Sequence, residues 1–529
     1  MAPGPHRRRA AIALGAAAVL LLVVLVLALS SGGDAPPTGA ARLVPGNSLV
    51  YAHFSTDAGR KATQRAIAVA TRFPSYAKVR DGLLARLRVT GRGTGVDFGR
   101  DIRPWLGKEA AFALVPEGTV AKSLIVLDIA HKEGAKLFLG RLGRPTGVST
   151  HGGSTITEYG SQGVAFVSHY LLAGAPEAIA QGIDAQAGRR PPLAKDANYK
   201  RAAAKEPAGR FADVYAPVTG IRRVLAPRGG LFGTLASLVD QPALAGTAIS
   251  LSAASNGVRA KVHSTLRTEG VGTPNPAFAS FEPSLPDRAP APALAYVDLA
   301  GLDRALPRLL AATGSASLSG RLGLLLAQAG QGLKGAGVDV ERDVLPLFRD
   351  EAALLITPHN PLPTLTLISR ARDEQKVREA FAQLQAPLAQ VFAPGGGPGQ
   401  APTFTDRIVA GVHAFQLHLS PTFELDYAVF DGQLVASTSL DGIAAARSRK
   451  GRIASDRAFQ TVLAKRPKEV TSLVFLDLSQ LLSLGEQIGL SQDARYTKVR
   501  GDLKRIHGVG FVSSRGENDT TAELFLQIP

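Results

Sequence analysis

The chain has 529 residues, is 45% hydrophobic, and carries a formal net charge of +17 without a single cysteine. Disulfides, thiol nucleophiles, cysteine-ligated zinc and iron–sulfur clusters are therefore excluded. The length allows two hydrophobic cores, because a single core stops growing near about 250–300 residues. The hydrophobic content is typical of a globular protein rather than of a disordered stalk.

The N-terminus predicts a membrane anchor. Arg7 to Arg9 precede an uninterrupted apolar run from Ala10 to Leu29, long enough as a helix to span about 30 Å, the thickness of a bilayer core. Arginines on this side predict a single-pass protein of the cell membrane with a cytoplasmic N-terminus and an extracytoplasmic body. A cleaved secretory signal is the alternative, since Ala28 and Ser30 are small enough for a cleavage site, although signal cores are usually about 7–15 residues long.

The charge outside the predicted membrane is also positive. Arg7 to Arg9 contribute three of the seventeen charges, which leaves +14 (17 − 3) on the rest of the chain. Besides the membrane itself, anionic lipids and anionic envelope polymers are therefore candidate partners. The alternative is a solvated basic surface without a partner, because the chain has no run of five basic residues. Nucleic acid is a poor partner, since no recognisable binding module is present.

One segment of the chain occurs twice. Gly95 to Ala111 reads GVDFGRDIRPWLGKEAA and Gly337 to Ala353 reads GVDVERDVLPLFRDEAA, with nine identities in seventeen ungapped positions. A second match, at an offset of 260, pairs DANYKRAAAKEP from Asp196 with DRAFQTVLAKRP from Asp456. These matches predict a tandem duplication of one domain.

The predicted elements follow the same order in both units. In the first unit they are a strand at 49–54, helices at 61–71 and 76–87, strands at 110–115 and 123–128, a helix at 132–142, strands at 164–168 and 170–174, a helix from 196 and a terminal hairpin at 247–266. In the second unit they are a strand at 294–299, helices at 302–312 and 321–333, strands at 352–357 and 364–369, a helix at 373–389, a hairpin at 425–430 and 433–437, a helix from 456 and a terminal hairpin at 508–528.

Hairpins dominate this order, with helices inserted between them, which favours an α+β fold on antiparallel sheets. In the first terminal hairpin, apolar Val258, Ala260 and Val262 alternate with polar residues, which predicts one buried and one wet face. The predicted organisation is a cytoplasmic N-terminus at 1–9, a transmembrane helix at 10–30, a flexible linker at 31–41, a first α+β unit at 42–267, a Pro-rich joint at 268–292 and a second α+β unit at 293–529.

Several segments together resemble a known family. They are PGNSLVYAHF, GVDFGRDIRPWLG, LLAGAPEAIAQGIDA and the closing hairpin, and they are similar to an uncharacterised bacterial family, domain of unknown function three-three-five-two. The resemblance covers nearly the whole chain after the linker, although the second unit has Leu347 where the first has Trp105, and Arg349 for Gly107. It implies an N-terminal membrane segment and an envelope location, and it carries over no activity and no catalytic residue.

The repeated carboxylates are the best candidates for a site. They are Asp97, Asp101 and Glu109, echoed by Asp339, Asp343 and Glu351. A Ca²⁺ site needs about six to eight oxygens at a denser spacing, and acid–base chemistry needs two carboxylates converging on a cleft. We therefore expect Asp97 and Asp339 to cap a short helix and the others to pair with Arg100 or Arg342.

Other motifs are weaker. Ser75 and Lys78 form an S-x-x-K without the K-T-G and S-D-N partners of the penicillin-recognising enzymes. His413 and His418 are five apart on a predicted strand and so point to opposite faces. The GGGPG stretch at 395–399 reads as a loop, and Trp105 as a packing anchor.

We therefore expect no catalytic residue, no cofactor and no metal site. The expected function is that of a membrane-tethered extracytoplasmic envelope protein acting as a non-enzymatic binding or scaffold module. A carrier or chaperone for lipids or lipoproteins is the first alternative, and a wall or lipid hydrolase the second. An apolar cleft would favour the carrier, convergent catalytic side chains in a pocket the hydrolase, and filled cores the scaffold.

Overall fold

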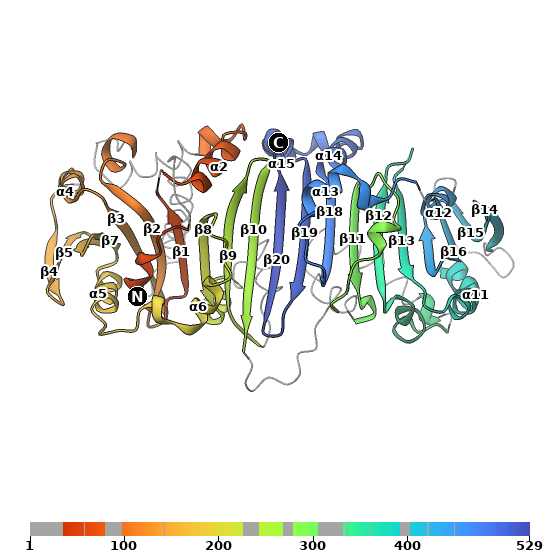
Figure 1. Cartoon of the computed structure of the whole chain (residues 1–529), viewed down its shortest axis with the longest axis horizontal. Helices are drawn as coiled ribbons and strands as arrows, with labels where there is room; N and C mark the ends of the chain where they lie inside the picture. The colour runs from red at the N-terminus through yellow and green to blue at the C-terminus, as the bar shows by residue number, and fades with distance from the viewer. Residues whose placement is uncertain are drawn as a thin grey trace.

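A computed structural model describes most of the chain. The described residues are 35–57, 59–79, 98–141, 143–225, 243–267, 279–304, 332–335, 337–360, 362–391, 403–420, 423–448 and 450–529. Within these ranges, twenty strands form one sheet in which every described strand pair is antiparallel (Figure 1). The predicted antiparallel architecture with inserted helices is therefore present.

The first ten strands make up one half of the sheet. They are β1 (Val50–Ser55), β2 (Leu106–Glu117), β3 (Val120–Ile129), β4 (Gly147–His151), β5 (Ser154–Tyr159), β6 (Gln162–Val167), β7 (Tyr170–Gly174), β8 (Arg210–Pro217), β9 (Leu244–Ala254) and β10 (Gly257–Leu266). Their pairings give the order β4-β5-β6-β7-β3-β2-β1-β8-β9-β10 across the sheet.

The second ten strands make up the other half. They are β11 (Ala295–Ala300), β12 (Glu351–Thr357), β13 (Thr364–Arg370), β14 (Thr405–Val409), β15 (Val412–Ser420), β16 (Phe423–Phe430), β17 (Gln433–Ser437), β18 (Ser472–Asp477), β19 (Gly508–Arg515) and β20 (Asp519–Gln527). Their order is β14-β15-β16-β17-β13-β12-β11-β18-β19-β20, the order of the first half with each strand number raised by ten.

The two halves meet at their last strands. β10 pairs with β20 along its length, from Gly257 opposite Gln527 to Thr265 opposite Asp519. The two halves therefore share one continuous sheet, since their terminal hairpins join edge to edge. Pairing of this kind satisfies the unpaired backbone groups that each half would otherwise expose at an edge strand.

Helices cover both faces of the sheet. They are α2 (Lys61–Ala70), α4 (Lys132–Gly140), α5 (Pro176–Gln186), α6 (Ala197–Ala203), α7 (Val218–Gly220), α11 (Glu374–Val391), α12 (Leu440–Arg447), α13 (Arg457–Leu463), α14 (Leu478–Gln487) and α15 (Ala494–Leu503). Successive strand residues point to opposite faces. Accordingly, Tyr51 packs in a core with Ile179 of α5 and Tyr199 of α6, whereas Ala52 packs in another core with Ala66 of α2.

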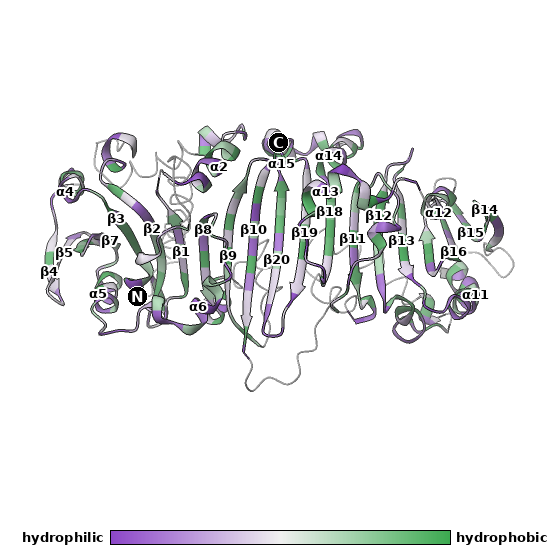
Figure 2. Ribbon diagram, in the orientation of Figure 1, coloured by the Kyte–Doolittle hydropathy of each residue, from purple (hydrophilic) through white to green (hydrophobic). Residues whose placement is uncertain are grey.

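Each half has its own cores. The largest cluster of the first half centres on α5, α6 and β1 to β3, and that of the second half on α12, α13 and β11 to β13. Hydrophobic residues run along the strands, interrupted by polar positions (Figure 2). Asp196 and Asp456 cap α6 and α13 by accepting hydrogen bonds from backbone amides, which explains the match at an offset of 260.

Two predicted boundaries are corrected. A 3₁₀ helix, η1 (Gly39–Arg42), lies inside the predicted linker at 31–41, and Ala40 and Ala41 are buried. Likewise a 3₁₀ helix, η6 (Leu285–Asp287), lies inside the predicted joint at 268–292, with Leu285 fully buried. Proline and glycine made both segments resemble linkers, but tertiary contacts fix them in the core.

Other expectations fare differently. α2 ends one residue before its predicted end, whereas the helices predicted at 76–87, 302–312 and 321–333 lie largely outside the described residues. The alternation predicted for β10 is wrong, because polar His263 is buried while apolar Val258 is only half-buried in the seam with β20. No helix among the described residues is both long and apolar enough to cross a membrane, and the segment predicted to do so, 10–30, lies outside them.

Candidate functional site

Strand register gathers ionisable side chains in the first half. His53 on β1 lies opposite Asp213 on β8, and Glu109 on β2 lies two positions further along, opposite Ser55. Residues two apart on a strand share a face. His53, Asp213 and Glu109 therefore lie together on the face covered by α5 and α6, although they come from segments far apart in the chain.

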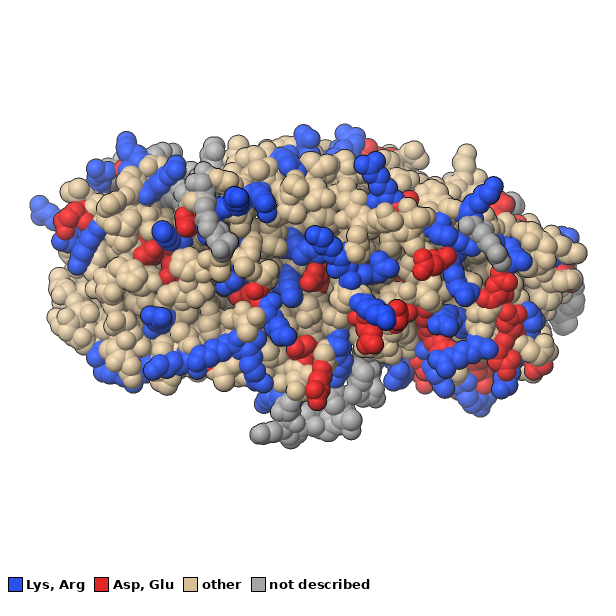
Figure 3. All heavy atoms as spheres, in the orientation of Figure 1, with Lys and Arg blue, Asp and Glu red and all other residues tan. Residues whose placement is uncertain are grey.

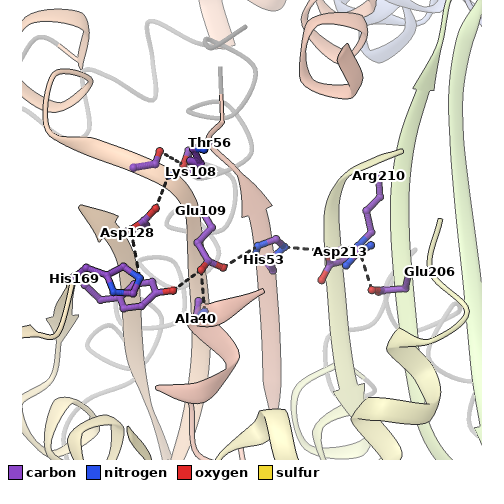
Figure 4. Close-up of polar contacts among 12 residues, drawn as sticks. Ala40, His53, Thr56, Lys108, Glu109, Asp128, His169, Glu206, Arg210 and Asp213 are labelled. Carbon is purple, nitrogen blue, oxygen red and sulfur yellow. Dashed lines mark hydrogen bonds and ion pairs between the residues drawn. The ribbon is translucent and has the colours of Figure 1, made fainter. Parts of the chain in front are cut away.

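These side chains form a continuous buried network (Figure 4). His53 Nδ1 lies 3.0 Å from Asp213 Oδ1, and its Nε2 lies 3.3 Å from Glu109 Oε2. Arg210 Nε donates to Asp213 Oδ1 at 2.8 Å and lies 3.2 Å from a Glu206 oxygen. None of these side chains is more than 8% exposed, and His53 is fully buried.

The network shifts the pKa values of its members. Burial opposes the charge of His53, but the two carboxylates outweigh it and raise the pKa of His53 to about 9. Burial also opposes the charge of Asp213, yet His53 and Arg210 hold its pKa below the usual value. Burial, followed by the charge of Asp213, raises the pKa of Glu206 to about 8 despite the nearby Arg210. The first half therefore contains a protonated histidine between two carboxylates near neutral pH.

Glu109 also holds the short helix η1 in place. Its Oε1 accepts a hydrogen bond from the Tyr170 hydroxyl at 2.5 Å and another from the backbone amide of Ala40 in η1 at 3.2 Å. Gly39 permits this close approach, because a Cβ atom there would collide with the Tyr170 hydroxyl. The network thus anchors η1 to the sheet.

A surface cavity lies beside this anchored segment. It has a volume of about 550 Å³ and opens between η1, the end of α5, the 3₁₀ helix η3 (Leu193–Lys195) and α6. Exposed Arg42 and Lys195 border it, and the mostly buried Tyr199 of α6 contributes to its wall. Tyr199 makes edge contacts with the rings of Tyr51 and Tyr215, so the cavity wall is continuous with the core around the network.

The corresponding part of the second half is different. Asp298 takes the place of His53 on the first strand, and Leu473 lies opposite it in the place of Asp213. Burial and the nearby Glu351 raise the pKa of Asp298 well above its usual value, and Tyr296 donates a hydrogen bond to it at 2.8 Å. Glu351 accepts hydrogen bonds from the backbone amides of Ser284 and Leu285 and thereby anchors η6.

The repeated carboxylates that the structure describes do not converge on a cleft. Asp339 caps the segment Val340–Val344 through the amides of Glu341 and Arg342, and Arg342 pairs with Asp343, as expected from the sequence. Asp101 likewise pairs with Arg100 and also with Arg141. Asp97 lies outside the described residues. Of the carboxylates singled out in the sequence, Glu109 and Glu351 are the buried pair that anchor η1 and η6.

The remaining motifs remain separate. Ser75 donates its backbone amide to Asp502, while Lys78 is exposed. His413 lies near Asp406 and His418 near Glu424, on exposed strand positions. Trp105 is 2% exposed and packs against Phe138, as expected of a packing anchor. The GGGPG loop lies outside the described residues, and within those residues no group of three or more His, Asp or Glu is arranged to hold a metal ion.

The sequence analysis missed His53, Asp213, Arg210 and Glu206. A signal was present, because His53 and Asp213 interrupt strongly apolar strand patterns at inward positions beside Tyr51 and Tyr215. Their pairing depends on the register of three strands separated by more than fifty residues each. That register was not available from local periodicity.

Fold and site together define a large antiparallel-sheet protein with helices on both faces, a sealed charge network and a basic surface cavity. The chain belongs to the family described as Protein of unknown function (DUF3352), whose sequence model matches residues 9–528. This confirms the resemblance seen in the repeated and opening segments.

Solved structures add little. Three crystal forms of TP0453 are similar to part of the chain. Form III aligns at 12% identity and a TM-score of 0.26 over 45% of this chain and 84% of that one. Form I aligns at 9% identity and a TM-score of 0.27 over 45% of this chain and 82% of that one. Form IV aligns at 13% identity and a TM-score of 0.24 over 44% of this chain and 81% of that one. At these TM-scores the similarity carries no argument. No curated protein sequence matches the chain.

Proposed function

We propose that this protein is a non-enzymatic binding platform of the cell envelope, tethered by residues 10–30 to the membrane with its body outside. The observation that carries this proposal is that the network of five ionisable groups around His53 is sealed from solvent. His53 has no exposed surface, and Glu109 and Asp213 are almost fully buried. Groups that cannot touch a substrate cannot act on one, which disfavours a hydrolase centred on this network.

We therefore assign the binding function to the protein surface, which is basic. Lysine and arginine side chains are spread over the visible face and gather along its lower edge, where α5 and α6 lie (Figure 3). A surface of this sign attracts anionic polymers and lipids through long-range Coulomb forces. The described cavity is bordered by Arg42 and Lys195, whose charges favour an anionic ligand.

We further propose that the two halves are copies of one ancestral domain. Their identical strand order, the capped helices at an offset of 260 and the paired Glu109 and Glu351 anchors support this origin. Joining the copies at β10 and β20 gives one continuous sheet in an elongated body (Figure 1). Such a body suits a scaffold, since it presents a large surface.

A binding assay tests the proposed function. The full-length protein in neutral detergent micelles is mixed with a purified anionic wall polymer, with a neutral polysaccharide as the control. Because the Debye length falls from about 10 Å at 0.1 M salt to about 3 Å at 1 M, binding should occur at low salt and be lost at high salt. Absence of binding at low salt, or binding that persists at 1 M salt, would contradict an electrostatic platform, and the second result would favour the carrier.

Topology needs its own test. Protease added to intact spheroplasts should digest the body, because the arginines before the apolar run predict that it lies outside. Full protection of residues 35–529 in sealed cells would refute the outward orientation.

A further inference from the structure

We propose that the cavity beside η1 and its basic surroundings dock on the anionic phospholipid headgroups of the membrane that carries the tether. Four exposed side chains, Arg42, Lys195, Lys200 and Arg201, form this surface, called here the basic rim. The inference rests on the proposed function, because it requires the body to be tethered outside the membrane. It adds which surface faces the bilayer and what it recognises there.

The tether places the basic rim close to the bilayer. The predicted membrane helix ends at residue 30, and Thr38 and Gly39 already border the cavity. Eight or nine residues span at most about 30 Å when fully extended. The segment after η1 is fixed against the cavity as well, since Gly46 donates its amide to Pro191 and Leu193 donates its amide to Val44. The cavity therefore cannot move far from the headgroup layer.

The charge of the basic rim is available to a ligand. Among the described residues, no carboxylate lies within ion-pair distance of Lys195 or Lys200. The acidic residues nearby have other partners: Asp184 binds Arg189, Asp196 caps α6, and Glu206 is buried against Arg210. Each basic residue held near an anionic lipid surface contributes on the order of a fivefold gain in the docked population.

Three of the four residues of the basic rim are replaced by uncharged residues at the matching place in the second half. At the offset of 260, Lys195, Lys200 and Arg201 correspond to Ser455, Gln460 and Thr461, while the backbone geometry is retained as a 3₁₀ helix followed by an Asp-capped α-helix. The segment 193–205 contains four basic residues and one acidic residue, whereas 453–465 contains two and one. Within this segment, basic side chains are therefore more numerous in the half next to the tether.

The two segments also lie on opposite sides of the body, at opposite ends of the sheet's strands. β8 and β18 run antiparallel, because five antiparallel pairings separate them across the seam. α6 precedes β8 and α13 precedes β18, so the two helices lie toward opposite edges (Figure 1). A body that rests on the membrane through α6 holds α13 away from it, which makes α13 a natural control.

Fluorescence quenching in lipid nanodiscs tests the inference. The chain has no cysteine, so Gln186→Cys at the cavity and Ser455→Cys at the opposite edge each accept a single dye. The full-length protein is placed in phosphatidylcholine nanodiscs, with or without about one-third phosphatidylglycerol, that carry a headgroup quencher. The dye at position 186 should be quenched when phosphatidylglycerol is present, and its fluorescence should recover at 1 M salt. The dye at position 455 should remain bright in both lipid mixtures.

Charge-matched variants complete the test. The double variant Lys195→Gln/Lys200→Gln should lower the ratio of docked to undocked protein roughly 25-fold. Arg457→Gln/Lys465→Gln removes the same charge at the opposite edge and should leave it unchanged. Equal quenching in both lipid mixtures, or equal losses for the two variants, would overturn the inference. Failure to enter nanodiscs would instead refute the membrane tether, and polymer binding in micelles remains a separate measure of the platform.

Discussion

Glu109 and Glu351 occupy matching positions in the two halves, but their surroundings differ in charge. Both hold a short 3₁₀ helix by accepting backbone amides, in η1 and η6 respectively. Glu109 additionally faces a protonated His53, whereas Glu351 lies near Asp298, whose pKa is raised by burial. The comparison shows that anchoring is the shared role of the repeated glutamate, and that the charge network belongs to the half next to the predicted tether.

Removal of Glu109 should have the largest effect on stability. Glu109→Ala removes one of the two carboxylates that face His53, so that Asp213 is its remaining partner, and it also frees η1. Breaking a buried pair in this way costs about 3–5 kcal/mol. Urea unfolding followed by Trp105, the sole tryptophan and a residue of the first half, measures the loss. Glu351→Ala is the matched control. This variant leaves buried amides unsatisfied but takes no partner from a charged histidine. Its loss of unfolding free energy should therefore be smaller, about 1–3 kcal/mol, and circular dichroism of urea unfolding should detect it. Equal losses would erase the difference between the halves.

Alkaline pH should weaken the first half. Because the pKa of His53 is raised from 6.5 to about 9, its stabilisation is complete below pH 6.5 and is lost as pH rises through 9. At about 1.4 kcal/mol per unit, the ceiling is roughly 3 kcal/mol. The pKa of Glu206, raised to about 8, acts in the same direction. Urea unfolding at pH 6.5 and at pH 9 measures this slope.

Two histidine variants separate the source of this slope. His53→Gln should make it shallower. His263→Gln should leave it unchanged, because burial lowers the pKa of His263 and confines its effect to acid pH. A slope that survives in His53→Gln at full size would place the titrating group elsewhere.

The close approach at Gly39 should matter less than the glutamate it faces. Gly39→Ala pushes a methyl group against the Tyr170 hydroxyl, and overpacking of this kind typically costs about 1–3 kcal/mol. The shift should appear in the Trp105 unfolding curve. The nearby Gly188→Ala substitution also replaces a glycine beside the cavity, at a φ of +75° but in open space, and so separates backbone strain from crowding. If Gly39→Ala leaves the unfolding curve unchanged, η1 is not held against Tyr170 as described.

Replacement of Asp298 should change stability least. Asp298→Asn keeps an acceptor for the Tyr296 hydroxyl and removes a carboxyl whose ionisation is unfavourable in the core. Since the raised pKa of Asp298 costs stability as pH increases, the variant should match the natural protein in acid and exceed it at alkaline pH. Circular dichroism of urea unfolding at both ends of this range measures the change. Large destabilisation at all pH values would mean that Asp298 is charged and paired.

Much of the fold could be predicted from local sequence. Turn residues and alternation located the hairpins, as with β16 and β17 around Asp431-Gly432, and helical spacing located α2 and α11. Composition predicted a linker and a joint where the structure has η1 and η6, because proline-rich and glycine-rich segments are typical of linkers. The buried glutamates that hold these two short helices lie elsewhere in the chain. The join between β10 and β20 was not predictable, since edge pairing leaves no local pattern.

The site was less predictable than the fold. Glu109 was singled out from its repetition, but its partners His53 and Asp213 come from strands whose register only the folded sheet establishes. Repetition identified what both halves share, which is the anchor. It could not identify what distinguishes them, namely the charge network and the basic rim of the first half.

The protonation state of His53 is the most direct test of the sealed charge network in the first half. Selective labelling of the histidine rings, with His53→Gln to assign the signal, allows its titration to be followed by nuclear magnetic resonance in the intact protein. We predict that His53 stays protonated at neutral pH and titrates near 9, between two ionised carboxylates. A His53 ring that is neutral at pH 7 would contradict a sealed charge network in the first half and remove its contrast with the second.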